Sequence, residues 1–154
     1  MDPLLAIQYK SFMYEYLELD HMELVDESTD LPTYYLPHHA VFKADSSTTK
    51  MRVLFNGSAA ASFGLSLNEI LLKGLKVQPD IIQILWHFGL FNIPITAEVA
   101  KMYRQVLMSF DDSEWQRILY RASPDPPLKH YKLKTVTFGT KSASFLATRC
   151  TTCR

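Results

Sequence analysis

The stretch "QRILYRASPDPPLKHYKLKTVTFG", residues 116–139, decides the fold class of this chain. Its two ends, "QRILYRA" and "YKLKTVTFG", are rich in branched and aromatic residues, as β-strands are. The segment between them, "SPDPPLKH", is rich in proline, which lacks the backbone N–H that a helix or a central strand needs. The stretch therefore predicts two strands joined by a proline-rich turn.

A second strand pair is predicted in "YYLPHHAVFKADSSTTKMRVLFNGS", residues 34–58. Two runs of aromatic and branched residues flank the polar residues 45–49, a pattern typical of a β-hairpin. His38 and His39 are adjacent in the first run, so their side chains point to opposite faces of the strand. We expect a structural role for both rather than a shared metal ion.

Helices are predicted on both sides of this hairpin. Apolar residues recur at helical spacing over residues 4–19, and an acidic, turn-rich loop follows at residues 26–33. A short helix is expected within residues 61–74. Another begins after Pro79 and Asp80 and ends near Gly89. The segment "TKSASFLATRC", residues 140–150, predicts the first turns of a last helix.

The segment "ITAEVAKMYRQV", residues 95–106, begins like a strand and ends like a helix. We expect a strand over residues 93–99, which places Glu98 at its end, and then a helical turn through Tyr103 and Arg104. Hairpins, helices and this strand together predict an α+β fold. A length of 154 residues and 47% hydrophobic composition suit one compact domain with a core.

The formal net charge of +0 hides a split along the chain. Residues 1–30 contain eight acidic residues and one basic residue, Lys10, and so carry −7. Residues 31–154 contain the other eight acids and fifteen bases, and so carry +7. The split predicts an acidic lead-in on a basic body that could face phosphates, although an ordinary mixed surface explains it equally well.

The N-terminal thirty residues lack the basic and apolar regions of a signal peptide. No run of about 18 apolar residues is present to cross a membrane. The expectation is an intracellular protein, cytoplasmic or nuclear, without a membrane partner.

Glu98 is the first candidate for chemistry. A carboxylate at the end of a buried strand is costly unless it is hydrogen-bonded, paired or bound to a cation. Magnesium is usually held by one or two protein carboxylates, and two-metal phosphoryl transfer needs more than one. Asp111 and Asp112 lie in a turn that we expect to face solvent. A salt-bridged strand end is therefore an equal alternative for Glu98.

Lys43 and Arg52 lie on the two arms of the predicted hairpin of residues 34–58. The planar fork of arginine and the point charge of lysine both suit phosphate oxygens, so the pair could clamp a triphosphate. The alternative is that they are surface charges that protect an edge strand from pairing with another chain.

A resemblance narrows these alternatives. The segments "YYLPHHAVFKADSSTTKMRVLFNGSA", "SLNEILLKG", "PITAEVAKMYRQV", "QRILYR" and "YKLKTVTFGTKSASFLATRC" resemble, in this order, the fingers and first half of the palm of reverse transcriptases from Bel/Pao-type long-terminal-repeat retrotransposons. The resemblance covers most of residues 34–150. It implies a partial right-hand polymerase fold, with residues 1–30 as an acidic helix and loop ahead of a truncated fingers and palm region, residues 31–154.

The resemblance also implies ligands and residue roles. It implies an RNA-directed DNA polymerase family that uses Mg²⁺, deoxynucleoside triphosphates and an RNA or DNA template-primer. Glu98 stands at the place of the first metal-binding aspartate, and Tyr103 at that of the aromatic residue that excludes ribonucleotides. The remaining carried-over positions are expected to bind the nucleotide: Lys43, Arg52, Phe138 and Gly139.

This sequence differs from the family at positions that matter for polymerase activity. The family carries Asp where this chain has Glu98, usually Asp at Asn56, and tends to have Pro at Ser144. The longer Glu98 side chain moves its carboxylate by about 1.5 Å, and a misplacement of this size costs on the order of a hundredfold in rate. The family's second metal-binding element, an aromatic-x-Asp-Asp hairpin, lies beyond the segment "LATRC", and the sequence stops at Arg154.

Three functions follow as hypotheses. The first is a reverse-transcriptase fragment that is inactive alone and does not bind Mg²⁺ productively. The second is a non-catalytic module that binds a nucleotide or nucleic acid. The third is a protein-interaction remnant whose partner is another chain, such as one that carries the missing polymerase segments. We favour the first and expect no primer extension by this chain alone.

Overall fold

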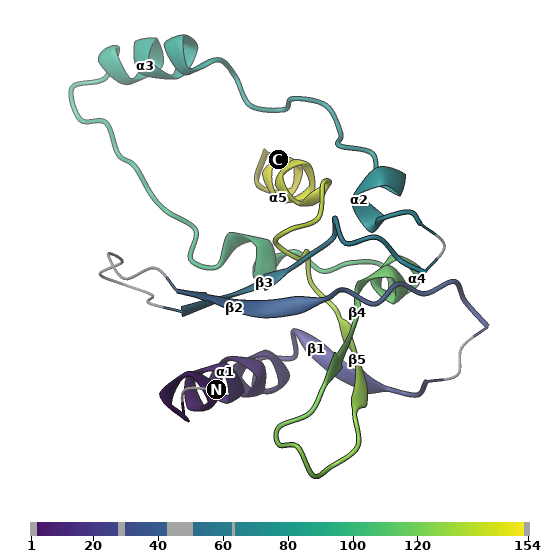
Figure 1. Ribbon diagram of the computed structural model, residues 1–154. Helices are drawn as coiled ribbons and strands as arrows, with labels where there is room; N and C mark the ends of the chain where they lie inside the picture. Colours follow the sequence, from purple (N-terminus) through teal and green to yellow (C-terminus); the bar gives the residue numbers. More distant parts are fainter. Residues whose placement is uncertain (1–2, 28–29, 43–50, 63, 153–154) are drawn as a thin grey trace.

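A three-stranded antiparallel sheet lies at the centre of the fold (Figure 1). The computed structural model describes residues 3–27, 30–42, 51–62 and 64–152. In the central sheet, β5 (Lys129–Leu133) lies between β1 (Met22–Val25) and β4 (Arg117–Tyr120). Met22 pairs with Leu133, and Ile118 pairs with Tyr131, so one face of the sheet is apolar.

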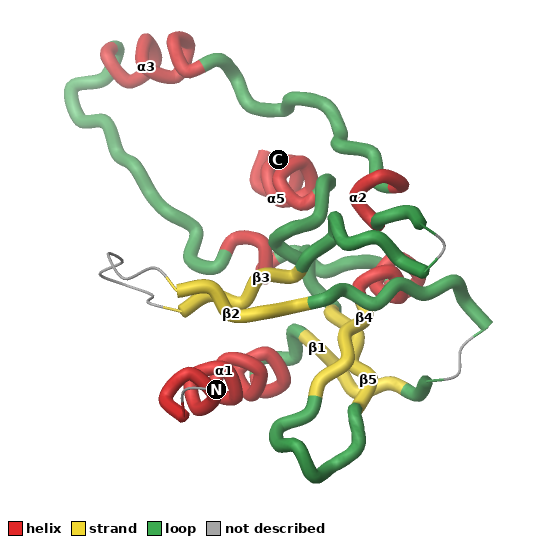
Figure 2. The backbone as a smooth tube through the Cα atoms, viewed as in Figure 1, coloured by secondary structure: helices red, strands yellow, loops and turns green. Residues whose placement is uncertain are grey.

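A two-stranded antiparallel sheet, β2 (His38–Phe42) and β3 (Met51–Phe55), lies beside the central sheet. A single parallel bridge between Tyr35 and Arg117 links the chain that leads into β2 to the start of β4. Helix α1 (Pro3–Glu18) packs against this arrangement (Figure 2). The buried core contains side chains from α1, from both sheets, from the segment before β2 and from the residue that begins the helix at 67–70: Met13, Tyr16, Met22, Tyr34, Leu36, Val53, Phe55, Leu67, Ile118, Tyr131 and Leu133.

Five shorter helical elements complete the described fold before the C-terminal helix. They are α2 (Leu67–Ile70), α3 (Ile81–Gly89), the 3₁₀ turn η1 (Met102–Gln105), α4 (Phe110–Ser113) and the 3₁₀ turn η2 (Glu114–Gln116). Helix α5 (Ala143–Thr152) follows. In Figures 1 and 2, α3 stands at the outer end of a long excursion, away from both sheets.

The α+β fold class is confirmed, and both strand pairs and the predicted helices are present. The last predicted strand, residues 131–139, has other bounds: β5 begins two residues earlier, at Lys129, and ends at Leu133, and residues 134–139 are coil and turn with one isolated bridge at Thr135. The polar tip of the hairpin, residues 45–49, lies outside the described residues. His38 has the expected structural role: its ring bonds to the hydroxyl of Tyr9 on α1, and its Nε2 lies 3.0 Å from the carbonyl oxygen of Leu119. His39 points the other way and is exposed.

The predicted strand over residues 93–99 is wrong. These residues form an extended coil, and all of them are exposed. Alternating residues become a strand when a neighbouring strand pairs with their backbone, and no strand within the described residues pairs with this segment. Pro94 also removes one of the N–H donors that such pairing requires.

The acidic lead-in contains an element that the sequence did not indicate. Residues 22–25 form β1, which pairs with β5 more than one hundred residues later in the chain. A four-residue run is too short to identify by its alternation, and its partner is set by tertiary structure. None of the helices in the described part of the chain is long and apolar enough to cross a membrane.

Candidate functional site

Three of the predicted nucleotide-binding residues line one open cavity of about 610 Å³. Tyr103 reaches it from η1, and Phe138 and Gly139 reach it from the turn between β5 and α5. We call it the Tyr103 cavity. Other residues of its wall come from the segment after β3, from α2 and from the start of α5: Ser58, Asn68, Glu69, Lys141 and Ser144.

Two aromatic rings form an apolar wall of the Tyr103 cavity. The rings of Tyr103 and Phe138 meet edge to face, with centroids 5.6 Å apart and planes at 75°. The Tyr103 hydroxyl lies 3.3 Å from the Ser144 hydroxyl. Phe138 is 58% exposed, which leaves part of its ring available for stacking.

Gly139 holds this aromatic wall in place. Its φ of +110° lies in the region that favours glycine, and a Cβ atom at this position would lie 2.0 Å from the carbonyl oxygen of Phe55. The turn therefore packs directly on the end of β3. Since Phe138 is the adjacent residue, this close approach sets where its ring lies.

Asn68 ties three segments of the cavity wall together. Its side-chain nitrogen donates to the Gly139 carbonyl at 3.0 Å and to the Ser58 hydroxyl at 2.8 Å. Its side-chain oxygen accepts from the backbone N–H of Lys141 at 2.7 Å. Sequence reasoning missed Asn68, because asparagine is common in loops and its partners are 10 to 73 residues away.

Opposite charges line the Tyr103 cavity. The carboxylate of Glu69 accepts hydrogen bonds from the hydroxyl and the backbone N–H of Ser66, both at 2.7 Å. These bonds hold the pKa of the Glu69 carboxyl below its ordinary value. Lys141 contributes a cation to the wall of the same cavity, and its charge also lowers the pKa of Glu69.

Two further residues, Arg52 and Lys43, were predicted to bind the nucleotide. Arg52 lies exposed on β3, opposite Val41, and is not part of the cavity wall. Lys43 lies outside the described residues.

Glu98 lies exposed in coil rather than at a strand end. Among the described residues, no group of three or more His, Cys, Asp or Glu side chains comes together to hold a metal ion. Glu98 is therefore not part of such a cluster, and no catalytic step is assigned to magnesium.

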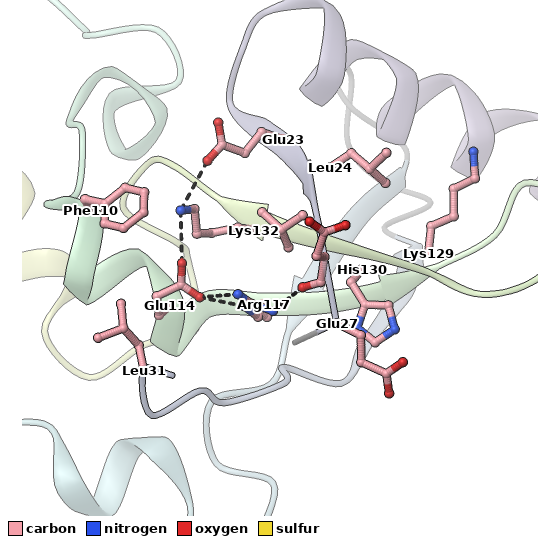
Figure 3. Close-up of a pocket in the computed structure, with 12 residues that line it drawn as sticks. Glu23, Leu24, Glu27, Leu31, Phe110, Glu114, Arg117, Lys129, His130 and Lys132 are labelled. Carbon is pink, nitrogen blue, oxygen red and sulfur yellow. Dashed lines mark hydrogen bonds and ion pairs between the residues drawn. The ribbon is translucent and has the colours of Figure 1, made fainter. Parts of the chain in front are cut away.

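A second cavity, of about 630 Å³, lies beside the polar face of the central sheet (Figure 3). Behind it is a buried charge cluster of Glu114, Arg117 and Lys132, whose side chains are 3–4% exposed. Glu114 accepts from Lys132 at 3.0 Å and from Arg117 at 2.6 Å. Arg117 also donates to the carbonyl oxygen of Asp26 at 2.9 Å.

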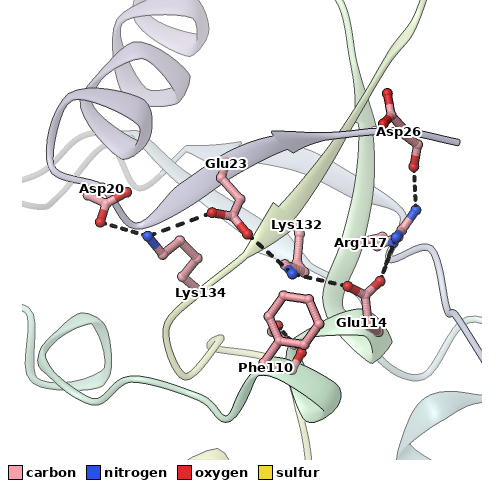
Figure 4. Close-up of polar contacts among 9 residues, drawn as sticks. Asp20, Glu23, Asp26, Phe110, Glu114, Arg117, Lys132 and Lys134 are labelled. Carbon is pink, nitrogen blue, oxygen red and sulfur yellow. Dashed lines mark hydrogen bonds and ion pairs between the residues drawn. The ribbon is translucent and has the colours of Figure 1, made fainter. Parts of the chain in front are cut away.

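The charge cluster extends to β1 (Figure 4). The Lys132 ammonium lies 3.2 Å from the Glu23 carboxylate and 3.8 Å from the centre of the Phe110 ring. Burial raises the pKa of the Glu114 carboxyl, but the hydrogen bonds from Lys132 and Arg117 outweigh burial and leave it below its ordinary value. Sequence reasoning missed this cluster, because its members come from three strands and η2.

The charge cluster acts as a structural element. Every buried side-chain nitrogen and oxygen among the described residues has a hydrogen-bond partner, and within the cluster Glu114 accepts from both Arg117 and Lys132. The Tyr103 cavity is the candidate site because three of the predicted nucleotide-binding residues line it.

We compared the chain with protein-family models and with curated proteins. No protein-family model matches the chain, and no curated protein matches it either.

Proposed function

We propose that this chain is a fingers-and-palm region of reverse-transcriptase type, related to Bel/Pao-type retrotransposons, whose Tyr103 cavity binds a deoxynucleoside triphosphate. One observation carries the proposal: Tyr103, Phe138 and Gly139 were expected from the resemblance to bind the nucleotide, and all three line the same cavity. They come from two segments more than 30 residues apart, so the sequence order does not by itself bring them together.

The chemistry of the cavity supports a nucleotide as the ligand. An exposed aromatic ring offers a face for a base or sugar, and stacking of a base on an aromatic side chain contributes about 1–3 kcal/mol. Lys141 offers a cation for phosphate oxygens. The adjacent Tyr103 ring narrows the cavity beside Phe138, as a residue that senses the 2′ position of the sugar would.

We further propose that this chain does not extend a primer by itself. The support is the exposed position of Glu98 and the lack of any clustered metal-ligand set among the described residues. The chemistry that remains is binding, which can be measured without turnover.

Binding of dTTP, measured by isothermal titration calorimetry with the purified chain, tests the proposal. Phe138→Ala should weaken binding about 5- to 100-fold, because the stacking surface is removed. Phe110→Ala is the matched control: its ring is 68% exposed but lies on the other cavity, so dTTP affinity should stay within about twofold.

Two results would overturn this assignment. One is no heat of binding at millimolar dTTP, and the other is an equal effect of the Phe138 and Phe110 substitutions. Template-dependent extension of a primer above a no-protein control, with Mg²⁺ or Mn²⁺, would overturn the proposed lack of activity.

A further inference from the structure

Helix α3 is apolar and unburied at the same time. All nine of its residues, Ile81–Gly89, are exposed, and none of them contributes to the core. Figure 1 shows it at the outer end of the excursion between α2 and η1. A helix of this composition is ordinarily buried in a protein core or an interface, so its apolar surface calls for a partner.

The exposed side chains of α3 form a continuous stripe. At 100° per residue, Ile81, Ile82, Leu85 and Trp86 share one side of the helix, and they are 61–80% exposed. Gln83 and His87 lie on the opposite side. The stripe continues into the following coil through Leu90, Phe91, Ile93 and Ile95, which are 67–84% exposed.

The area of this surface is large enough for a stable interface. The apolar side chains of α3 and of the coil after it expose on the order of 1,000 Å² together, scaled from the 150–250 Å² of an aromatic residue. A standard protein–protein interface buries about 800 Å² on each partner. Apolar patches on monomeric proteins rarely exceed about 600 Å².

The charge of the surface indicates which partner fits. From Ile81 to Ala97 the sequence contains no Asp, Glu, Lys or Arg, so nothing in it selects an oppositely charged protein. In a two-fold symmetric dimer each residue meets the same patch of the other copy, and like charges would repel. An uncharged stripe avoids that repulsion, and the formal net charge of +0 adds none between whole molecules.

We propose that two copies of this chain pair through α3, with the stripe of Ile81, Ile82, Leu85 and Trp86 on one copy packed against the same stripe on the other. None of the stripe residues lines the Tyr103 cavity. The pairing does not depend on nucleotide binding.

Sedimentation velocity between 1 and 100 µM tests the pairing. The unmodified chain should change from monomer to dimer over this range. Leu85→Glu should weaken dimerisation on the order of a hundredfold, because a charge would be buried without a partner. Gln83→Glu adds the same charge on the opposite side of the same helix and should leave the dissociation constant within about twofold.

A second measurement does not depend on any variant. Hydrogen exchange of the α3 amides should slow as the concentration rises from 1 to 100 µM, whereas amides of β5 should not change. A monomer at 100 µM, a dimer that Leu85→Glu leaves intact, or polydisperse aggregates in place of a dimer would each overturn the proposal. Circular dichroism should show equal folding of both variants, because Leu85 and Gln83 are exposed in the single chain.

Discussion

Gly139 shows how one residue controls the candidate site. It combines a positive φ with the close approach of its Cα to the carbonyl oxygen of Phe55. No other residue type can occupy this position without moving either the turn or the end of β3, because the atom in the way is backbone. The neighbouring ring of Phe138 would move with the turn.

Gly139→Ala should destabilise the protein by about 3 kcal/mol or more, the sum of the left-handed conformation and the added bulk. For a domain of this size this lowers the melting temperature by about 6–12 °C, measurable by circular dichroism. Gly64→Ala is the control, because Gly64 has a φ of +85° but no atom within 4 Å of the added Cβ. It should cost about 1 kcal/mol. Equal losses for both variants would contradict the close approach to Phe55.

At the scale of secondary structure, the charge cluster of Glu114, Arg117 and Lys132 connects β4, β5 and η2, and Glu23 extends it to β1. The contacts between η2, β4 and β5 therefore depend on one buried carboxylate, that of Glu114. Removing one member of a buried ion pair is far more costly than replacing the whole set by apolar residues, because an uncompensated charge stays behind.

Glu114→Gln should lower the free energy of unfolding by about 3–5 kcal/mol at pH 7, measured by urea denaturation. Asp80→Asn is the matched control. The Asp80–Lys76 pair joins side chains that are 69% and 71% exposed, so its loss should cost less than about 1 kcal/mol. Similar losses for the two variants would show that the cluster does not stabilise the central sheet.

The same carboxylate gives the stability a pH dependence with a definite sign. The pKa of Glu114 is lowered in the folded state, so its contribution is complete above its unfolded value of about 4.3 and is lost as the pH falls below that value. In Glu114→Gln this part of the decrease in the free energy of unfolding at acidic pH should be absent. Parallel urea titrations at pH 5 and pH 3 measure the difference.

At the scale of the whole molecule, the charge split along the sequence becomes a set of ion pairs. Acidic residues before position 30 pair with basic residues of the body: Glu15 with Lys101 and Arg104, Asp20 with Lys134, and Glu23 with Lys132 and Lys134. The Glu15 pKa is lowered by its hydrogen bond from Lys101, and the Lys134 pKa is raised by its bond to Asp20. The lead-in thus neutralises part of the basic body.

Freeing these cations should promote binding of single-stranded nucleic acid. The double variant Glu15→Gln/Asp20→Asn should bind an oligonucleotide more tightly, and its affinity should fall more steeply with salt by about 1 in the log–log slope. Lys101 loses its Glu15 partner, and Lys134 keeps only the Glu23 carboxylate, 3.8 Å away. Fluorescence anisotropy between 25 and 200 mM NaCl measures both effects.

The control for this prediction is Glu98→Gln/Asp111→Asn. It removes the same two charges from exposed positions that make no ion pair within the described residues. An equal gain in affinity by the control would mean that net charge, and not the release of Lys101 and Lys134, is responsible.

The amino-acid sequence by itself determined the local structure. Proline-rich and polar turns between runs of branched and aromatic residues identified both strand pairs. Apolar residues at helical spacing identified α1, and Pro79 and Gly89 marked the two ends of α3. These patterns arise from neighbouring residues, so they are legible without the fold. The resemblance in sequence predicted Arg52, Tyr103, Phe138 and Gly139 as nucleotide-binding residues, and the last three line one cavity whereas Arg52 does not.

Only the tertiary structure decided which segments have partners. It left residues 93–99 without a pairing strand, so Glu98 lies in exposed coil, and it gave residues 22–25 a partner in β5. It also assembled the Asn68 contacts and the buried cluster around Glu114 from residues that are distant in sequence. Backbone pairing and buried charge both need a second segment to complete them, and the position of that second segment is a property of the folded chain.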